Sequence, residues 1–268
     1  MALDNPAFSR NKAFSSEAKT TTTAAAPSAE SLQQLYESPA ASSHDTGRMT
    51  VEDTIVKTAI SFVLLVAGGA VGWAFPAPSV WVPAALIGFA LALVNIFKKK
   101  PSAPLVLAYA VVEGVFVGAL SSFFEQQWPG IVIQAVLATI AVIAVTLALF
   151  ASGKIRASAR ATKVFLVAMI GYLLFSVINL VLMWTGANTN PFGLRGSVEI
   201  FGIPLGLVLG VLVVIMAAYS LVLDFDYIKR GTANRLPREY GWSGAFGIMV
   251  TVVWLYLELL RMFAIARN

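Results

Sequence analysis

The sequence contains no cysteine and a single histidine, His44. The lack of cysteine excludes disulfides, thiolate nucleophiles and cysteine-ligated metal sites. One histidine in a polar N-terminal segment cannot serve a Ser-His-Asp triad or an H-E-x-x-H zinc site within the apolar part of the chain. The composition therefore favours a protein that is not an enzyme and carries no cofactor.

Charge is also scarce, at 12% of the 268 residues, whereas soluble domains have about 25%. Eleven of the 33 charged residues lie within residues 1–53, and most others form short clusters between apolar runs. This distribution is typical of a multi-span membrane protein. It also explains the net charge of +5 through membrane topology, without nucleic acid as a partner.

Residues 1–50 are rich in Ala, Ser and Thr and contain few large apolar residues. Such a segment cannot bury enough surface to offset its conformational entropy, so we expect a disordered cytoplasmic tail. No apolar signal-peptide core occurs before Val51. Residues 51–268 form the second predicted region.

This second region divides into seven apolar segments, each close to the ~20 residues that cross a bilayer as a helix. Lipid cannot satisfy open backbone groups, so helices are required, and the expected fold is an all-α bundle of seven transmembrane helices. The expected spans are 54–75, 79–97, 104–124, 130–151, 162–184, 200–223 and 243–264.

Lysine and arginine in the joints indicate the orientation. Three joints on one side carry eleven basic residues, and the opposite joints carry only Arg195. By the positive-inside rule we expect the N-terminus in the cytoplasm and the C-terminus outside, in a bacterial plasma membrane. The eleven are Lys98, Lys99, Lys100, Lys154, Arg156, Arg160, Lys163, Lys229, Arg230, Arg235 and Arg238.

Glycines recur at four-residue spacing in three of the expected spans, which lets helix backbones approach closely. Packing inside the bundle is favoured over dimerisation, because seven helices are available as partners. The glycines are Gly68, Gly72, Gly114, Gly118, Gly202, Gly206 and Gly210.

Three acids lie within or at the end of apolar spans, where a charge costs at least ~2.5 kcal/mol at the bilayer centre. They are Glu113, Asp224 (with Asp226 two residues on) and Glu258. Lys57 and Arg261 lie near span ends and can extend to the interface. Two buried carboxyls that share a proton form a natural pH sensor, and once deprotonated they suit Ca²⁺.

Each acid also has a structural interpretation. Glu258 and Arg261 are three residues apart and can form a local ion pair. Asp224 can be an interfacial residue near Lys229 and Arg230, and Glu113 can be protonated and serve as a packing hydrogen bond.

The span endings YSLVLDFDYIKRG and WLYLELLR resemble motifs of spans 6 and 7 in the Bax inhibitor-1 family of seven-span proteins. Glu113, Gly114 and Gly118 in span 3 and the basic run after span 2 are also similar. The resemblance covers residues 51–268, and the tail and last loop resemble an actinobacterial branch of the family.

The resemblance implies a pH-sensitive calcium-leak channel. In that family an acidic pair on spans 6 and 7 near the cytoplasmic mouth biases closed against open conformations. The matching residues here are Asp224 and Glu258. A family basic residue linked to the pair matches the run Lys98, Lys99 and Lys100. The resemblance implies cations and lipid as partners.

Three departures from the family pattern bear on this pair. Span 7 has Glu in place of Asp, Leu223 precedes Asp224 in place of Tyr, and 34 residues separate the two acids. A straight span 7 from Trp242 places Glu258 ~24 Å along the axis, out of contact with Asp224. Contact requires residues 241–247 to be loop or interface, or span 6 to tilt. Otherwise Glu113 and Glu258 form the better pair.

One alternative is a proton-coupled secondary transporter that uses the same acids, which would favour internal repeats and broken helices. A second alternative is a non-conducting scaffold that binds stress or protease partners in the membrane.

Overall fold

The computed structural model describes residues 28, 29, 33 and 47–268. Most of the predicted tail therefore lies outside the described residues. Its last four residues belong to the folded part: Arg48 forms a β-bridge with Pro237, and Met49 is 1% exposed. The Met49 backbone N–H also donates to the carbonyl of Leu236 at 2.7 Å.

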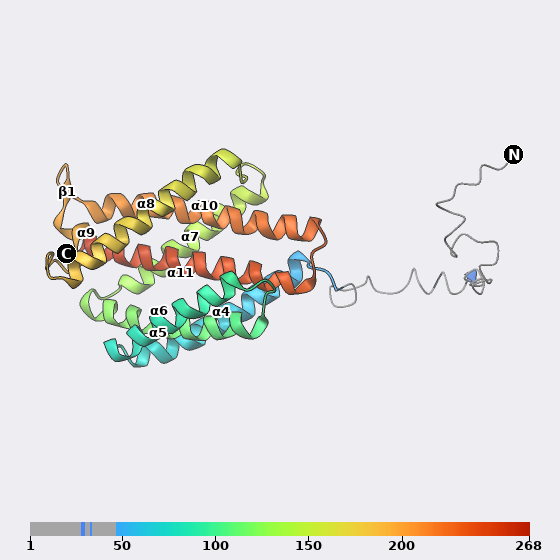
Figure 1. The fold of residues 1–268 in the computed structure, drawn as a ribbon, viewed down its shortest axis with the longest axis horizontal. Coiled ribbons are helices and arrows are strands. Elements are labelled where there is room, and N and C mark those ends of the chain that lie inside the picture. Colours follow the sequence, from blue (N-terminus) through green and yellow to red (C-terminus); the bar gives the residue numbers. More distant parts are fainter. Residues whose placement is uncertain (1–27, 30–32, 34–46) are drawn as a thin grey trace, which may run out of the picture. The chain divides into compact units, whose positions relative to one another are not determined.

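In the described part of the chain, seven helices are long and apolar enough to cross a membrane, as predicted, and they run side by side (Figure 1). The first four are α4 (Val51–Ala74), α5 (Pro78–Phe97), α6 (Ala103–Gln127) and α7 (Ile131–Ala151). The other three are α8 (Ala159–Trp184), α10 (Leu205–Ala233) and α11 (Gly241–Ala266). A short helix η2 (Arg238–Tyr240) leads into α11.

The helix starts follow from local sequence. The Thr50 side chain accepts a hydrogen bond from the backbone N–H of Asp53, and Ser158 accepts one from Ala161, so both cap a helix N-terminus. Pro78 occupies the first position of α5, where a missing N–H has no cost.

The sixth span is displaced from the prediction by several residues at each end. Residues 199–204 form a two-stranded antiparallel hairpin, β1 (Glu199–Ile200) and β2 (Ile203–Pro204). Gly202 has a positive φ of 77° in its turn, so it is a turn residue and not part of a helical glycine stripe. At the other end α10 continues past Asp224 to Ala233.

Glycines bring α4 and α6 together. A Cβ at Gly72 would lie 2.1 Å from the carbonyl oxygen of Val115, and one at Gly118 would lie 2.0 Å from that of Gly69. Gly68 and Gly114 are equally close to the opposite backbone. The predicted intramolecular packing of these stripes is therefore confirmed.

Helix α11 is the centre of the bundle. It lies between α10 on one side and α4 and α6 on the other (Figure 1). In the most apolar stretch of α11, 61% of the residues are buried, whereas in that of α8 only 6% are. Leu255 and Leu260 of α11 form a buried cluster with Ile131 and Ala135 of α7 and Ala217 of α10. Side chains on α11 are therefore placed to act inside the protein.

The three basic joints lie at one end of the bundle, which we call the inner end. One cavity there is lined by Lys98 and Lys99 together with Tyr240 and Ser243. A second is lined by residues 157–159 together with Asn234 and Leu236. The α8–α10 connection lies at the opposite, outer end, and there Gly193 (φ 60°) allows the backbone N–H of Leu194 to donate to Asn179 Oδ1.

Candidate functional site

Asp224 lies on α10, facing α11. The hydroxyl of Thr251 donates to Asp224 Oδ2 at 2.7 Å, and Ser220 Oγ lies 3.2 Å from the same hydroxyl. Gly247, one turn earlier on α11, leaves room for the carboxylate, because a Cβ there would lie 2.8 Å from Asp224 Oδ1. Within the described residues Asp224 forms no ion pair.

Asp224 lines a cavity of about 390 Å³ at the inner end, which we call the inner cavity. Lys98 and Lys99 line the same cavity, so the structure brings these predicted basic residues and the predicted acid to one space. Lys100 does not line it. Neither Lys98 nor Lys99 forms an ion pair or hydrogen bond with Asp224 in the described residues.

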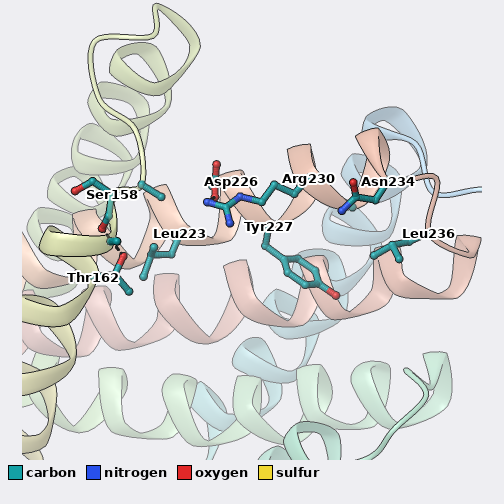
Figure 2. Close-up of a pocket in the computed structure, with 11 residues that line it drawn as sticks. Ser158, Thr162, Leu223, Asp226, Tyr227, Arg230, Asn234 and Leu236 are labelled. Atoms are coloured by element: carbon teal, nitrogen blue, oxygen red, sulfur yellow. Dashed lines mark hydrogen bonds and ion pairs between the residues drawn. The ribbon is translucent and has the colours of Figure 1, made fainter.

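Asp226 belongs to a different environment. It forms an i, i+4 ion pair with Arg230, whose side chain is 69% exposed. Figure 2 shows both residues lining a cavity of about 650 Å³ between the start of α8 and the end of α10. This acid is therefore paired at the surface, although only two residues separate it from Asp224.

Glu258 is paired with arginine at the outer half of α11. Arg195 Nη1 donates to Glu258 Oε1 at 2.7 Å, and Arg261 Nη1 lies 3.1 Å from Glu258 Oε2. The Tyr172 hydroxyl donates to Glu258 Oε2 at 2.8 Å. Glu258 and Arg195 are 1% and 3% exposed. The predicted local pair of Glu258 and Arg261 is confirmed.

Arg195 reaches this site from α9 (Leu194–Ser197) in the α8–α10 connection. Its guanidinium also donates to the Tyr172 hydroxyl and Ser176 Oγ and lies 5.1 Å from the Tyr172 ring centroid. Burial lowers the pKa of Arg195, but the Glu258 carboxylate and Tyr172 raise it by more, so the net pKa is above its ordinary value. Arg195 therefore stays cationic.

The structure does not bring Asp224 and Glu258 together. The residue of α11 that contacts Asp224 is Thr251, and Glu258 lies seven residues, or about 10 Å along the axis, further on. Contact required residues 241–247 to be loop or interface, or span 6 to tilt. Residues 241–247 form the first two turns of α11, and Asp224 of span 6 meets Thr251. The two acids are thus separate centres at different depths.

The alternative pairing of Glu113 with Glu258 is not formed either. Glu113 lies on α6 facing α5, where a Cβ at Gly88 would lie 2.7 Å from Glu113 Oε2. No ion pair or hydrogen bond of Glu113 is present in the described part of the chain. Among the same residues, no cluster of three or more acidic or histidine side chains is arranged to hold a metal ion.

Lys57 does not extend to the interface as expected. It is 5% exposed, and its ammonium donates to Asp53 Oδ2 and to the backbone carbonyl of Arg238 at 2.6 Å. Arg238 in turn donates to Asp53 Oδ1 at 2.8 and 3.0 Å. These charges join the start of α4 to the α10–α11 joint, so they have a structural role at the inner end.

Sequence reasoning missed three residues of these sites: Arg195, Tyr172 and Thr251. In the sequence Arg195 stands out only as the single basic residue of the outer joints. This isolation is itself a signal, because a guanidinium buried among apolar segments requires an acidic partner. Neither hydroxyl could have been distinguished from the many others in the spans.

Comparison with known proteins supports the resemblance seen in the motifs. No curated protein matches the chain. The family model described as Bax inhibitor 1 like matches residues 5–268, which include all seven spans and every acid described above. The chain is therefore a multi-pass membrane protein that belongs to the Bax inhibitor 1 like family.

Proposed function

We propose that the protein is a pH-sensitive cation leak that passes Ca²⁺, and that Asp224 is the acid whose protonation controls it. The observation that supports this most directly is the state of Asp224. It is a carboxyl within the bundle with a hydroxyl as its direct partner, next to a cavity that also contains two lysines.

The chemistry of this centre suits a reversible switch. Burying an ionised carboxylate without a bonded cation costs free energy. Protonation or a passing cation can each neutralise this charge. Lys98 and Lys99 compete with both. We expect cation flux to rise as pH rises, because only the ionised Asp224 attracts Ca²⁺.

Glu258 has a different part in the proposal. Its ion pair with Arg195 fastens the α8–α10 connection to the outer half of α11, and its ion pair with Arg261 lies within α11. The proposed gate thus has two acidic centres, an inner one that titrates and an outer one that holds a connection in place. In this proposal two separate acids take the place of the expected pair of Asp224 and Glu258.

The test is Ca²⁺ entry into proteoliposomes that contain a fluorescent Ca²⁺ indicator, measured across a range of pH. Wild-type protein is expected to conduct with a pH-dependent rate. Asp224→Asn, which cannot ionise, is expected to give the low-pH rate at every pH.

Asp226→Asn is the matched control, since it removes an acid two residues away that is already paired with Arg230. Its pH profile is expected to follow the wild type. No Ca²⁺ entry above that of empty liposomes would overturn the leak, and a wild-type profile in Asp224→Asn would overturn the sensor assignment.

No structural observation favours the alternatives over the leak. The seven spans are continuous helices, and Pro83, the proline within α5, does not divide it. A proton-coupled transporter would favour broken helices. A scaffold function would rest mainly on residues 1–46, most of which lie outside the described part, and it stays a prediction.

A further inference from the structure

A cavity of about 830 Å³ lies at the outer half of the protein, between α6, α8, α11 and the segment 191–195; we call it the outer cavity. Its walls are aromatic and aliphatic, and Arg195 and Arg261 also line it. Volumes of about 300–1,000 Å³ with apolar walls and a few polar groups are typical of small-molecule sites. The aromatic walls come from Trp81, Phe123, Phe124, Trp128, Phe192 and Trp254.

The charges at this cavity do not balance. Arg195 and Arg261 both pair with Glu258, and no other acidic side chain forms an ion pair with either in the described residues. Among the side chains one positive charge is left over; the C-terminal Asn268 also lines the cavity, but it forms no ion pair with either arginine in the described residues. Arg195 is enclosed, whereas the Arg261 side chain is 33% exposed. Arg261 therefore presents the excess charge to the cavity, near the end of α11.

A second polar group at the cavity lacks a partner. The indole Nε1 of Trp81 is enclosed, and within the described residues it has no hydrogen-bond acceptor. Buried donors are usually satisfied, but this nitrogen has almost no accessible surface and does not itself face the cavity. The excess charge of the arginines at the cavity therefore favours a ligand, and an acidic headgroup supplies the missing negative charge.

The cavity is also suited to entry from the bilayer. Helix α8 forms one wall through Tyr172, Ser176, Leu180 and Met183, and it is the least enclosed of the seven spans. Arg261 lies five residues before the end of α11, about 7.5 Å inside. A phospholipid phosphate would sit nearer the interface, whereas a single-chain acid can enter to this depth.

We propose that the outer cavity binds a long-chain fatty acid, with its carboxylate on Arg261 and its hydrocarbon chain against the aromatic walls. A planar carboxylate accepts two parallel hydrogen bonds from a guanidinium. The site is distinct from the inner cavity, and binding requires no ion flux, so it can be tested independently of the leak.

The test uses full-length protein in detergent and a naturally fluorescent polyene fatty acid as probe. Energy transfer from tryptophan reports its arrival, because three tryptophans line the cavity. Saturable transfer that oleate displaces is expected. Oleyl alcohol has the same chain without the charge, and its affinity as a competitor is expected to be lower than that of oleate by about tenfold or more.

Arg261→Met is expected to weaken probe binding about tenfold or more. Arg267→Met, at the C-cap of the same helix, is the matched control, since Arg267 bonds to Pro129 and Gln134 and does not line the cavity. Leu180→Trp keeps all charges and is expected to abolish binding by filling the space, so the proposal stays testable if Arg261→Met fails to fold.

Three outcomes would overturn the proposal. They are no saturable binding, equal competition by oleate and oleyl alcohol, and wild-type affinity in both Arg261→Met and Leu180→Trp. Displacement by phosphatidylglycerol but not by oleate would equally overturn the choice of a fatty acid as ligand.

Discussion

At the scale of single residues, the partner of a buried acid decides its role. Asp224 has a hydroxyl partner and no ion pair among the described residues, whereas Glu258 is held by two guanidiniums and a phenol. Glu113 faces a glycine on α5. The three acids looked alike in the sequence because each was a carboxyl in an apolar span, but their surroundings differ in every case.

The Arg195–Glu258 pair yields a prediction about stability. Arg195→Met leaves Arg261 as the one cation that forms an ion pair with Glu258 among the described residues. Glu258→Gln leaves Arg195 buried without a carboxylate partner. Breaking such a pair costs about 3–5 kcal/mol, so each variant should lower the thermal midpoint in detergent. The double variant should recover part of the loss, and strictly additive losses would show that the pair is not coupled.

The pH dependence of this pair follows from the raised pKa of Arg195. A cation with a raised folded-state pKa stabilises the protein below its ordinary pKa and loses the effect only as pH rises through the raised one. The difference in thermal midpoint between the wild type and Arg195→Met should therefore stay constant from about pH 7 to about pH 10. A fall in this difference within that range would contradict the assignment.

At the scale of helices, glycine decides which spans touch. Gly68 and Gly72 of α4 lie against the α6 backbone at Val111 and Val115. Gly114 and Gly118 of α6 lie against the α4 backbone at Leu65 and Gly69. The pattern of small residues predicted close packing, and its intramolecular form was expected because many helices were available. The sixth span was less predictable, because the apolar residues 200–203 continue the hydropathy of α10 while Gly202 turns the chain into a hairpin.

Gly118→Ala should separate α4 from α6, because the new Cβ would lie 2.0 Å from the Gly69 carbonyl oxygen. We expect a destabilisation of about 1–3 kcal/mol, measured as a lower thermal midpoint. Gly171→Ala on α8 is the control, since nothing lies within 4 Å of its Cβ position. Both changes raise helix propensity equally, so equal midpoints would contradict close packing at Gly118.

At the scale of the whole molecule, seven spans and three basic joints at one end predict an orientation. The positive-inside rule predicts that this end, and with it the inner cavity and Asp224, faces the cytoplasm. The outer cavity and the α8–α10 connection then face outside. Proton sensing by Asp224 would thus report cytoplasmic pH.

Because the chain has no cysteine, single cysteines can map this orientation. Ala187→Cys lies in the exposed α8–α10 connection, and Ser152→Cys lies in the exposed α7–α8 joint. A membrane-impermeant maleimide should label Ala187→Cys on intact cells and Ser152→Cys only after permeabilisation. The reverse pattern would invert the topology.

The sequence by itself determined the class, the number of spans, the family resemblance and the three candidate acids, because hydropathy and charge are properties of local segments. It also determined which joints are basic, from which the orientation is inferred. These features need no knowledge of which helix faces which.

Only the tertiary structure decided how the acids are partnered. Helix α11 continues from Gly241 through 241–247, so its rotation and rise place Thr251, and not Glu258, against Asp224. Arg195 reaches Glu258 across 63 residues of sequence because the α8–α10 connection folds back into the bundle. Such contacts depend on the relative rotation and depth of packed helices, which no local pattern of residues specifies.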